Sequence, residues 1–408
     1  MAAPLTPSQI ATVKATAPTL KEHGTAITTL FYDNIISDVP ELKNVFNLTN
    51  QATGAQPRAL AAAVLAYATY VDDLAQLKAA VETIARKHAS LNIQAEHYPL
   101  VGKYLLDAVA KVLGDACTPE IAEAWTAAYA ALADIFINRE KQIYAAHENW
   151  KGWRRFKIQK KVPEATEITS FYLVPEDGSK LPVYLPGQYI SLRAQIPQLG
   201  HLQPRQYSLS DAPNSDHYRI SVKKEKGQQL GTPGLISNLL HENYEEGDVL
   251  EVTHPTGEFF VDPKEDKKTP IVLISAGVGI TPMIAIVNSA VATGSSRPIS
   301  LLYGAHSSEV QAFKETIMDA CGKHINIKAK IFLTTTREQD IHGVDYHFSG
   351  RMDLGKVDQQ GDLFIGDANT HYYVSGPSSF MKDTRKFLTD AGVGVKRVHL
   401  EVFGTGNE

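Results

Sequence analysis

PIVLISAGVGITPM, residues 270–283, is the stretch whose fold is easiest to read. It opens with a continuous apolar run, which is typical of a strand buried on both faces in a parallel sheet. Gly277 and Gly279 follow and lead into a helical pattern. Such a turn lets a phosphate approach the backbone at the start of a helix, but glycines also occur there for packing alone. The spacing GxGxxP matches the dinucleotide fingerprint only in part, so this stretch alone leaves both interpretations open.

Strand and helix patterns alternate from this stretch to the end of the chain. Further strands are expected in PISLLYGA (298–305), NIKAKIFLTT (326–335), HYYVSGP (371–377) and RVHLEVF (397–403). Alternation of this kind predicts an α/β domain with a doubly wound parallel sheet, which we place at residues 268–408.

Residues 152–264, which precede that domain, contain short β runs separated by proline, glycine, asparagine and aspartate. They predict a small antiparallel β-barrel with one short helix at 234–244, closed by a strand pattern over 248–261. The run RQYSLS (205–210) combines an arginine, a tyrosine and hydroxyls, a set that can bind a diphosphate and stack on a flat ring. An edge strand with a surface arginine is the simpler explanation of that run taken alone.

Residues 1–147 are rich in alanine and leucine at helical spacing, which predicts an all-α domain. In LKAAVETIARKHASL (77–91), His88 shares the apolar face of an expected helix. A histidine there is most often a core residue bonded to a carbonyl; the alternative is a haem ligand, because iron takes a neutral imidazole. Such a ligand needs a hydrogen-bonding partner, for which Tyr98 and Glu140 are candidates. The alternative for Glu140 is a helix-end residue turned to solvent.

Three residues are candidates for the other side of such a haem. Tyr32, in LFYDNII, and Gln56, in TGAQPRAL, can hydrogen-bond a bound ligand, and Phe46, in PELKNVFNL, can pack flat on a porphyrin. The alternatives are a core tyrosine, a surface glutamine and a core phenylalanine. The residues alone do not decide between these interpretations.

Composition excludes several classes of protein. The chain has 408 residues, 43% of them hydrophobic, and a net charge of −5, which argues against a disordered chain and against a nucleic-acid partner. Two cysteines are too few for a disulfide framework and fit a reducing compartment. No apolar run approaches the roughly 20 residues of a membrane span, and the N-terminus lacks a targeting pattern. We therefore expect a cytoplasmic, multidomain enzyme.

Read together, the motifs of residues 153–408 resemble those of the ferredoxin reductase superfamily. The ordered set is PGQYISL, RQYSLS, GLISNLL, AGVGITP, VSGPSSFM and EVFGTG. Two positions depart from the usual pattern, since Ser375 and Val402 stand where relatives often carry cysteine. The resemblance implies a flavin site and a nicotinamide nucleotide site, with arginine on phosphate, tyrosine on the flavin and serine near its ring nitrogen in RQYS.

The resemblance also implies contacts for each cofactor. Those for FAD would be Tyr189, Arg205, Gln206, Tyr207, Ser208, Ser237, Glu401, Val402, Phe403, Gly404 and Thr405. Those for NAD(P)H would be Gly277, Val278, Gly279, Ile280, Thr281 and Pro282.

The chain as a whole resembles the flavohaemoglobins, in which a globin is fused to such a reductase. The matching stretches include IATVKAT, FYDNII, PELKNVFNLTNQ, IARKHASL and FINREKQIY, together with the reductase motifs. The resemblance implies haem b bound by His88, with Tyr98 and Glu140 behind it and Tyr32 and Gln56 on the distal side. Further implied neighbours of the haem are Phe46, Leu60 and Lys87.

The implied activity is that of a nitric oxide dioxygenase, which converts NO and O₂ to nitrate with electrons that pass from NAD(P)H through FAD to haem. The implied partners are these small molecules alone, with no obligatory protein partner, and a monomer is expected. Two rival functions are a haem-based sensor of O₂ or NO and a general flavin reductase that acts on ferric chelates, quinones or another protein. The sequence shows no signalling domain, which weighs against the sensor.

Overall fold

The computed structural model describes residues 3–147, 149–227, 233–265 and 268–403. Within these ranges the chain forms two compact units. The first contains residues 3–154 together with 191–205, and the second contains the remaining described residues up to 403. No helix in the described ranges is both long enough and apolar enough to cross a bilayer.

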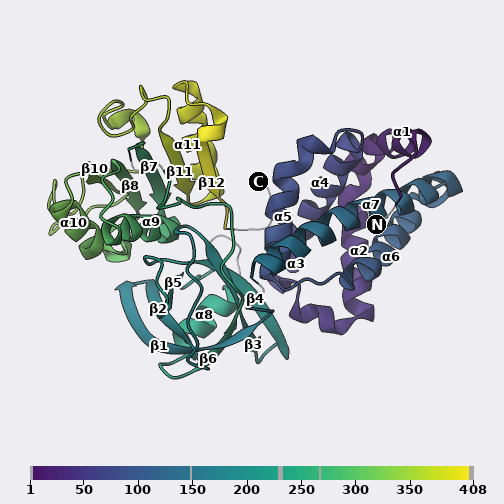
Figure 1. Ribbon diagram of the computed structural model, residues 1–408, viewed down its shortest axis with the longest axis horizontal. Helices are drawn as coiled ribbons and strands as arrows, with labels where there is room; N and C mark the ends of the chain where they lie inside the picture. Colours follow the sequence, from purple (N-terminus) through teal and green to yellow (C-terminus); the bar gives the residue numbers. More distant parts are fainter. Residues whose placement is uncertain (1–2, 148, 228–232, 266–267, 404–408) are drawn as a thin grey trace. The chain divides into compact units, whose positions relative to one another are not determined.

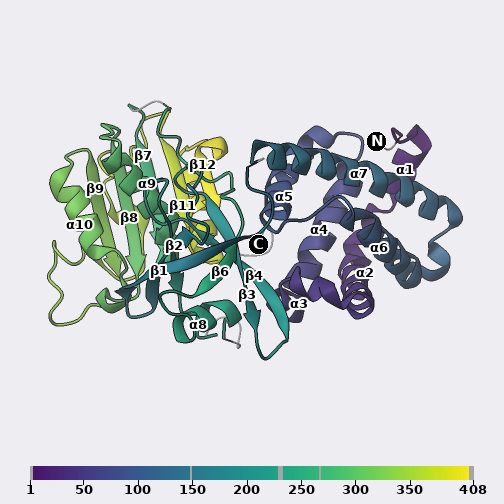
Figure 2. The ribbon, with the colours of Figure 1, turned by 60° about the horizontal axis from the view of Figure 1, so that its bottom comes forward.

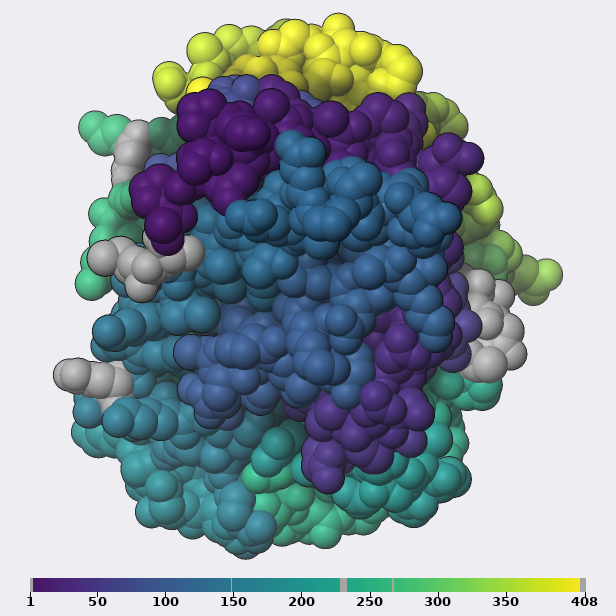
Figure 3. Space-filling model, turned by 90° about the vertical axis from the view of Figure 1, so that its right-hand side faces the viewer, coloured from purple at the N-terminus to yellow at the C-terminus, as the bar shows by residue number. Residues whose placement is uncertain are grey.

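The first unit is a bundle of helices built around α2 (Ala17–Asp38), which packs on α4 and α6 (Figure 1). Phe31 and Ile35 of this helix are buried in the shared core with Tyr67 and Trp125. The shorter α1, dark purple in Figure 3, lies on the outside and packs on α7. The other helices are α1 (Pro7–Ala15), α3 (Leu48–Ala52), α4 (Ala55–Tyr70), α5 (Lys78–Ser90), α6 (His97–Leu113) and α7 (Pro119–Ala146), with 3₁₀ turns η1 (Pro40–Asn44), η2 (Leu74–Leu77) and η3 (Gly114–Ala116).

Local chemistry explains where these helices begin. The Thr6 hydroxyl accepts from the backbone N–H of Gln9, and the Gln9 side chain accepts from the N–H of Thr6, so α1 starts with a capping box. Thr118 caps α7, and Pro119 follows at the first helical position, where its missing N–H costs nothing. Both stretches were rich in helix formers, and the caps set their first residue.

A six-stranded antiparallel sheet follows, in the order β4-β3-β6-β1-β2-β5. A bridge between Leu209, just after β4, and Ile220 of β5 brings the two ends of this order together and closes the barrel. The helix α8 (Leu235–Glu242) is inserted between β5 and β6. The strands are β1 (Arg154–Ala165), β2 (Ile168–Pro175), β3 (Tyr189–Ile196), β4 (His201–Ser208), β5 (Tyr218–Lys223) and β6 (Val249–Val252).

The last barrel strand is much shorter than its sequence pattern predicts. The pattern runs over 248–261, but β6 ends at Val252. Pro255 has no N–H to donate to a ladder, and Gly257 has a φ of +121°, which extended strands do not adopt. After β6 only an isolated bridge, between Tyr189 and Thr256, continues the pairing.

The C-terminal part is a parallel sheet in the order β10-β9-β8-β7-β11-β12, with helices α9 to α11 around it (Figures 1 and 2). The order reverses beside β7, the first strand, as in a doubly wound fold. The predicted succession of all-α, antiparallel β and doubly wound α/β parts is confirmed. The elements are β7 (Ile271–Ala276), η4 (Gly277–Gly279), α9 (Ile280–Ala292), β8 (Ile299–Ala305), η5 (Ser308–Val310), α10 (Lys314–Lys323), β9 (Ile327–Leu333), β10 (Phe348–Ser349), η6 (Leu354–Lys356), β11 (His371–Ser375), α11 (Ser378–Asp390), η7 (Val395–Arg397) and β12 (Val398–Glu401).

Candidate active site

His88, near the end of α5, lies in a hydrogen-bonded group with Tyr98 of α6 and Glu140 of α7. Its Nδ1 is 2.8 Å from Glu140 Oε1 and 3.1 Å from the Tyr98 hydroxyl, which itself donates to Glu140 Oε1 at 2.5 Å. Only 2% of Glu140 is exposed, so it is not the solvent-facing residue of the alternative interpretation. Three helices thus converge on one imidazole.

This arrangement fixes which nitrogen of His88 carries the proton. The Tyr98 hydroxyl hydrogen is already committed to Glu140, and an ionised carboxylate can only accept. Nδ1 must therefore donate its hydrogen to Glu140, and in the neutral ring the lone pair lies on Nε2. No residue described in the structure hydrogen-bonds that Nε2. Burial and the Glu140 charge raise the pKa of Tyr98, so its hydroxyl stays protonated at any ordinary pH.

Tyr32, on α2, belongs to the residues predicted for the other side of a haem. It is buried, and its ring is edge-on to that of Phe46 at a centroid distance of 5.3 Å. Burial raises the pKa of its hydroxyl, and the neighbouring side chain of Gln56, on α4, opposes this in part. The Oε1 atom of Gln56 is itself buried and without a hydrogen-bond partner. Leu60, one turn along α4 from Gln56, packs against the same core. A hydroxyl donor and an unsatisfied amide oxygen therefore lie at the same apolar core, where they could hydrogen-bond a small polar ligand.

The RQYS residues lie at the end of β4. A hydrogen bond from the Leu209 N–H to the carbonyl of Gln188 sets Ser208 beside Tyr189 on β3. The Ser208 hydroxyl is buried without a partner. Gly257 leaves room for the Tyr189 ring, since a Cβ there would lie 3.1 Å from ring carbons. An unsatisfied hydroxyl beside an aromatic ring fits a polar heterocycle such as flavin.

The other predicted flavin contacts are spread over several elements. Arg205 donates to the Pro204 carbonyl and, at 3.0 Å, to the Thr49 hydroxyl. Ser237, in the first turn of α8, accepts from the Glu225 N–H. Gln206 and Tyr207 are half-buried on β4, Glu401 ends β12, Val402 and Phe403 are exposed after it, and Gly404 and Thr405 lie outside the described residues. Lys87, predicted beside the haem, is half-buried on α5.

The two glycines of the turn after β7 differ in what surrounds them. Gly277 has a φ of +57°, and no atom lies within 4 Å of the place where a Cβ would be, so the backbone there is open to a ligand. Gly279 is required by packing, because a Cβ would overlap the backbone carbonyl of Ser375 on β11. The turn leads directly into the first helical residues, Ile280, Thr281 and Pro282. The packing interpretation thus holds for Gly279, whereas the open space at Gly277 is compatible with the phosphate interpretation.

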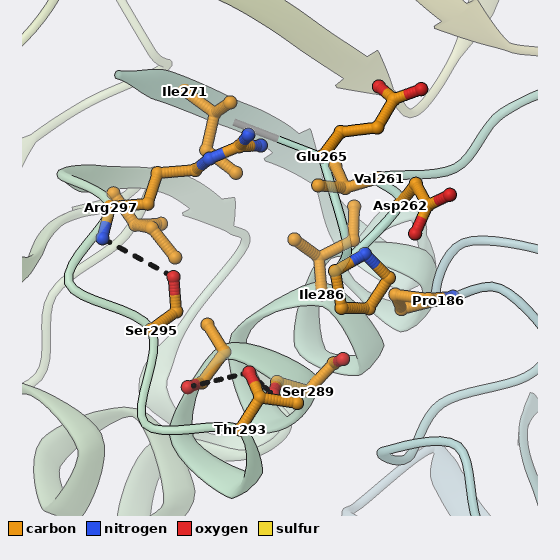
Figure 4. A pocket seen from close by; sticks show the side chains of 13 residues that line it. Pro186, Val261, Asp262, Glu265, Ile271, Ile286, Ser289, Thr293, Ser295 and Arg297 are labelled. Atoms are coloured by element: carbon orange, nitrogen blue, oxygen red, sulfur yellow. Dashed lines mark hydrogen bonds between the residues drawn. The ribbon is translucent and has the colours of Figure 1, made fainter. Parts of the chain in front are cut away.

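A small cavity of about 20 Å³ lies elsewhere in the second unit, between Pro186, Ile271, Ile286 and Arg297 (Figure 4). It has room for about one water molecule. Ile271 is at the amino end of β7, whereas the glycine turn follows its carboxyl end. Ligands of doubly wound sheets bind at the carboxyl ends of strands, so this cavity is not the nucleotide site.

Comparison with known proteins matches all three parts of the chain. Residues 29–136 match the globin family, 155–261 match the oxidoreductase FAD-binding domain, and 273–386 match the oxidoreductase NAD-binding domain. The flavohemoprotein of Bordetella pertussis is 46% identical over 98% of this chain and 99% of its own length. The chain belongs to the flavohemoprotein family. The flavohemoprotein of Bacillus subtilis is 43% identical over 96% of both chains.

Solved structures agree with membership of the flavohemoprotein family. A flavohemoglobin from Malassezia yamatoensis, crystallised with FAD and heme, superposes with a TM-score of 0.84 at 29% identity and covers 98% of this chain and 100% of its own. The FAD/NAD-binding domain of a nitric oxide dioxygenase from Vibrio cholerae covers 62% of this chain at 35% identity, with a TM-score of 0.54. The predicted family is thereby confirmed.

The structure also shows two residues that the sequence did not point to. Gln203 of β4 is fully buried and bonds the backbone of residues 43–48, and Thr49 accepts from Arg205. No sequence pattern signals either contact, because the partners are about 155 positions apart.

Proposed function

We propose that this chain is a nitric oxide dioxygenase that takes its electrons from NAD(P)H. FAD and haem b, when bound, supply the redox chemistry, in which a hydride is split into single electrons and NO and O₂ become nitrate. The observation that carries the proposal is the joining, in one chain, of the His88–Tyr98–Glu140 group to FAD-binding and NAD-binding folds. The Malassezia yamatoensis relative, which binds FAD and heme, supports the proposal. So does the Vibrio cholerae relative, whose title names a nitric oxide dioxygenase.

The residues fit a haem in the helical domain, which we place at residues 1–147. His88 presents an Nε2 lone pair, and the described residues hold no cluster of three metal-binding side chains nearby, so an iron there would take its remaining ligands from a porphyrin. Glu140 accepts the Nδ1 proton and thereby raises the basicity of the imidazole. Tyr32 and Gln56 would hold the small ligand, while Phe46, Leu60 and Lys87 would surround the haem.

The residues of the reductase half fit the other two cofactors. We place FAD in residues 152–264, held by Tyr189, the RQYS stretch and Ser237, with the segment from Glu401 to Thr405 covering it. We place NAD(P)H in residues 268–408, with its phosphates at the turn from Gly277 to Pro282. The open backbone at Gly277 and the start of α9 favour an anion there.

The cellular setting is part of the proposal. Cys117 and Cys321 are both free, which supports a reducing, cytoplasmic location. Because electron donor, relay and acceptor would lie in one chain, no protein partner is needed, and we propose a monomer.

The proposal predicts a fixed stoichiometry. One hydride carries two electrons and each turnover at the haem needs one, so each NADH should support the conversion of two NO and two O₂ to two nitrate. We expect this ratio from an NO electrode combined with nitrate analysis at saturating O₂. A haem-based sensor would bind NO without catalytic nitrate formation, and a general flavin reductase would oxidise NADH with ferric chelates regardless of NO.

Glu140→Gln tests the group behind His88. The amide keeps an acceptor but removes the negative charge that draws on the Nδ1 proton, so the imidazole becomes a weaker donor to iron. We expect a lower iron–histidine stretching frequency in resonance Raman spectra and NO turnover reduced roughly tenfold. Glu82→Gln is the matched control, because Glu82 pairs with Arg86 and Arg139 in the same helical domain. A stretching frequency unchanged in Glu140→Gln would show that the carboxylate does not act on the ligand.

A further inference from the structure

The side chain of Gln203, near the start of β4, is fully buried against the helical domain. Its Nε2 donates to the Lys43 carbonyl at 2.6 Å and lies 3.4 Å from the Phe46 carbonyl. Its Oε1 accepts from the Leu48 N–H at 3.1 Å. The hairpin residues 191–205 and this helical segment belong to the same compact unit.

The segment that Gln203 contacts joins two short helices, η1 and α3. It comprises residues 43–48, which lead from the last residues of η1 to Leu48 at the start of α3, and the N–H groups of Val45 and Phe46 are bonded to the Leu42 carbonyl. Asn47 caps the second and third N–H groups of α3, at Thr49 and Asn50. Gln203 satisfies the first, at Leu48, which would otherwise be left without a partner. The buried Gln203 amide therefore bonds backbone groups at both ends of the segment, at Lys43 and at Leu48.

Two further hydrogen bonds join β4 to this segment and to the first turn of α3. The Asn44 side chain accepts from the Leu202 N–H at 2.8 Å, and Arg205 donates to the Thr49 hydroxyl at 3.0 Å. Contacts from three of four consecutive positions of β4 define a specific junction, because a shift of one residue would turn the Gln203 side chain to the opposite face.

The segment carries Phe46, whose ring meets that of Tyr32 edge-on with an interplanar angle of 88°. Both residues line the ligand side of the pocket in the function proposed above. A change in the backbone at 43–48 would therefore move the Phe46 ring and, through it, the Tyr32 hydroxyl. The same strand continues into the RQYS residues, which end at Ser208, five positions after Gln203.

We propose that Gln203 is a positioning residue, which holds the 43–48 segment so that Phe46 packs on Tyr32 and fixes the geometry of the ligand pocket. The inference rests on the proposed function, since it assigns a role in the haem pocket of the globin to a residue of the reductase sequence. Gln203 would contact neither cofactor, and it would act only through the backbone groups to which it is hydrogen-bonded.

Gln203→Leu in the full-length holoprotein tests the proposal, because leucine keeps the volume and removes every hydrogen bond. We expect amide hydrogen exchange in a peptide covering 43–50 to become roughly tenfold faster. We also expect the C–O stretching band of the ferrous CO complex to shift from the parent position, since that band reports on the groups near the ligand. Asn44→Ala, which removes one outer bond of the junction, should move both readouts in the same direction by less, and it serves if Gln203→Leu does not fold.

Gln359→Leu is the matched control. Its Nε2 also donates to two loop carbonyls, those of Leu354 and Val357, but it lies in the second unit. It should leave both readouts at 43–50 and at the CO band unchanged. Faster exchange with an unmoved CO band would make Gln203 merely structural and overturn the proposal, as would unchanged exchange. Failure of the proposed function would instead appear in the parent chain, as NO that is not converted to nitrate.

Discussion

Replacing His88 by alanine is expected to abolish stable haem binding and, with it, NO consumption. His88 is the proposed protein ligand to the iron, and three helices hold its imidazole in place through Tyr98 and Glu140. The substitution also leaves Glu140, which is 2% exposed, with only the tyrosine as partner, and an underpaired buried carboxylate opposes closure of the pocket. We expect the purified variant to lack the Soret band that the parent shows.

Two controls separate loss of the ligand from loss of the fold. His23→Ala removes a histidine on α2 whose charged neighbour, Glu22, is 3.9 Å away, and it should bind haem like the parent. His88→Gly should regain a haem spectrum when imidazole is added, because the free base can occupy the cavity beside Glu140. Flavin reduction by NADH should persist in both His88 variants, since the proposed flavin ring contacts Tyr207 and Ser208 lie in the second unit. Full haem binding by His88→Ala would refute the assignment.

The second large effect is expected at Tyr32, the proposed distal tyrosine. Electron density shifts onto O₂ when it binds ferrous haem, and a donor in a dry pocket stabilises that charge. Tyr32 is buried, and its raised pKa keeps the hydroxyl protonated and able to donate. A hydrogen bond to a charged group contributes about 1.5–3 kcal/mol. Tyr32→Phe should therefore raise the O₂ dissociation rate about 10- to 150-fold, while the ring contact with Phe46 is retained.

Stopped-flow release of O₂ from the ferrous protein measures this effect. Tyr67→Phe is the matched control, since Tyr67 is another buried tyrosine of the helical domain, whose hydroxyl donates to the Ala128 carbonyl at 2.9 Å. It should lower stability and leave O₂ release alone. Gln56→Leu should have a smaller effect than Tyr32→Phe, because a neutral amide is a weaker donor to charge. Release at the parent rate from Tyr32→Phe would place the hydroxyl away from the ligand.

Much of the fold could be predicted from the sequence because local patterns determine it. The apolar run before Gly277 gave a buried parallel strand, and helical spacing around His88 gave α5 with that residue on its inner side. Local patterns were a poorer guide where single residues interrupt pairing. At Pro255 and Gly257 the hydrophobic alternation continues while the backbone leaves the sheet, so β6 ended nine residues early.

Some residues of the candidate site could be predicted from the sequence, and others could not. Glu140 drew attention because a carboxylate on an apolar face needs a partner, and the structure brings it to His88. The glycines illustrate the limit, since the sequence cannot tell that Gly277 faces open space whereas Gly279 meets the Ser375 backbone. Gln203 was out of reach, because a glutamine in a strand carries no signal of the distant backbone that it will bond. Contacts between distant parts of a chain need the tertiary structure.

The hairpin that completes the 43–48 segment also has a consequence for how the polypeptide is made. The globin sequence precedes Gln203 in the order of synthesis, so we expect the nascent globin to fold first, with the Leu48 N–H and the Lys43 carbonyl bonded to water. During that interval we expect the backbone on either side of Phe46 to be held less firmly, because the hydrogen bonds from Gln203 are not yet formed. The arrival of the hairpin then supplies them. A fragment cut at residue 147 would remain at the earlier stage.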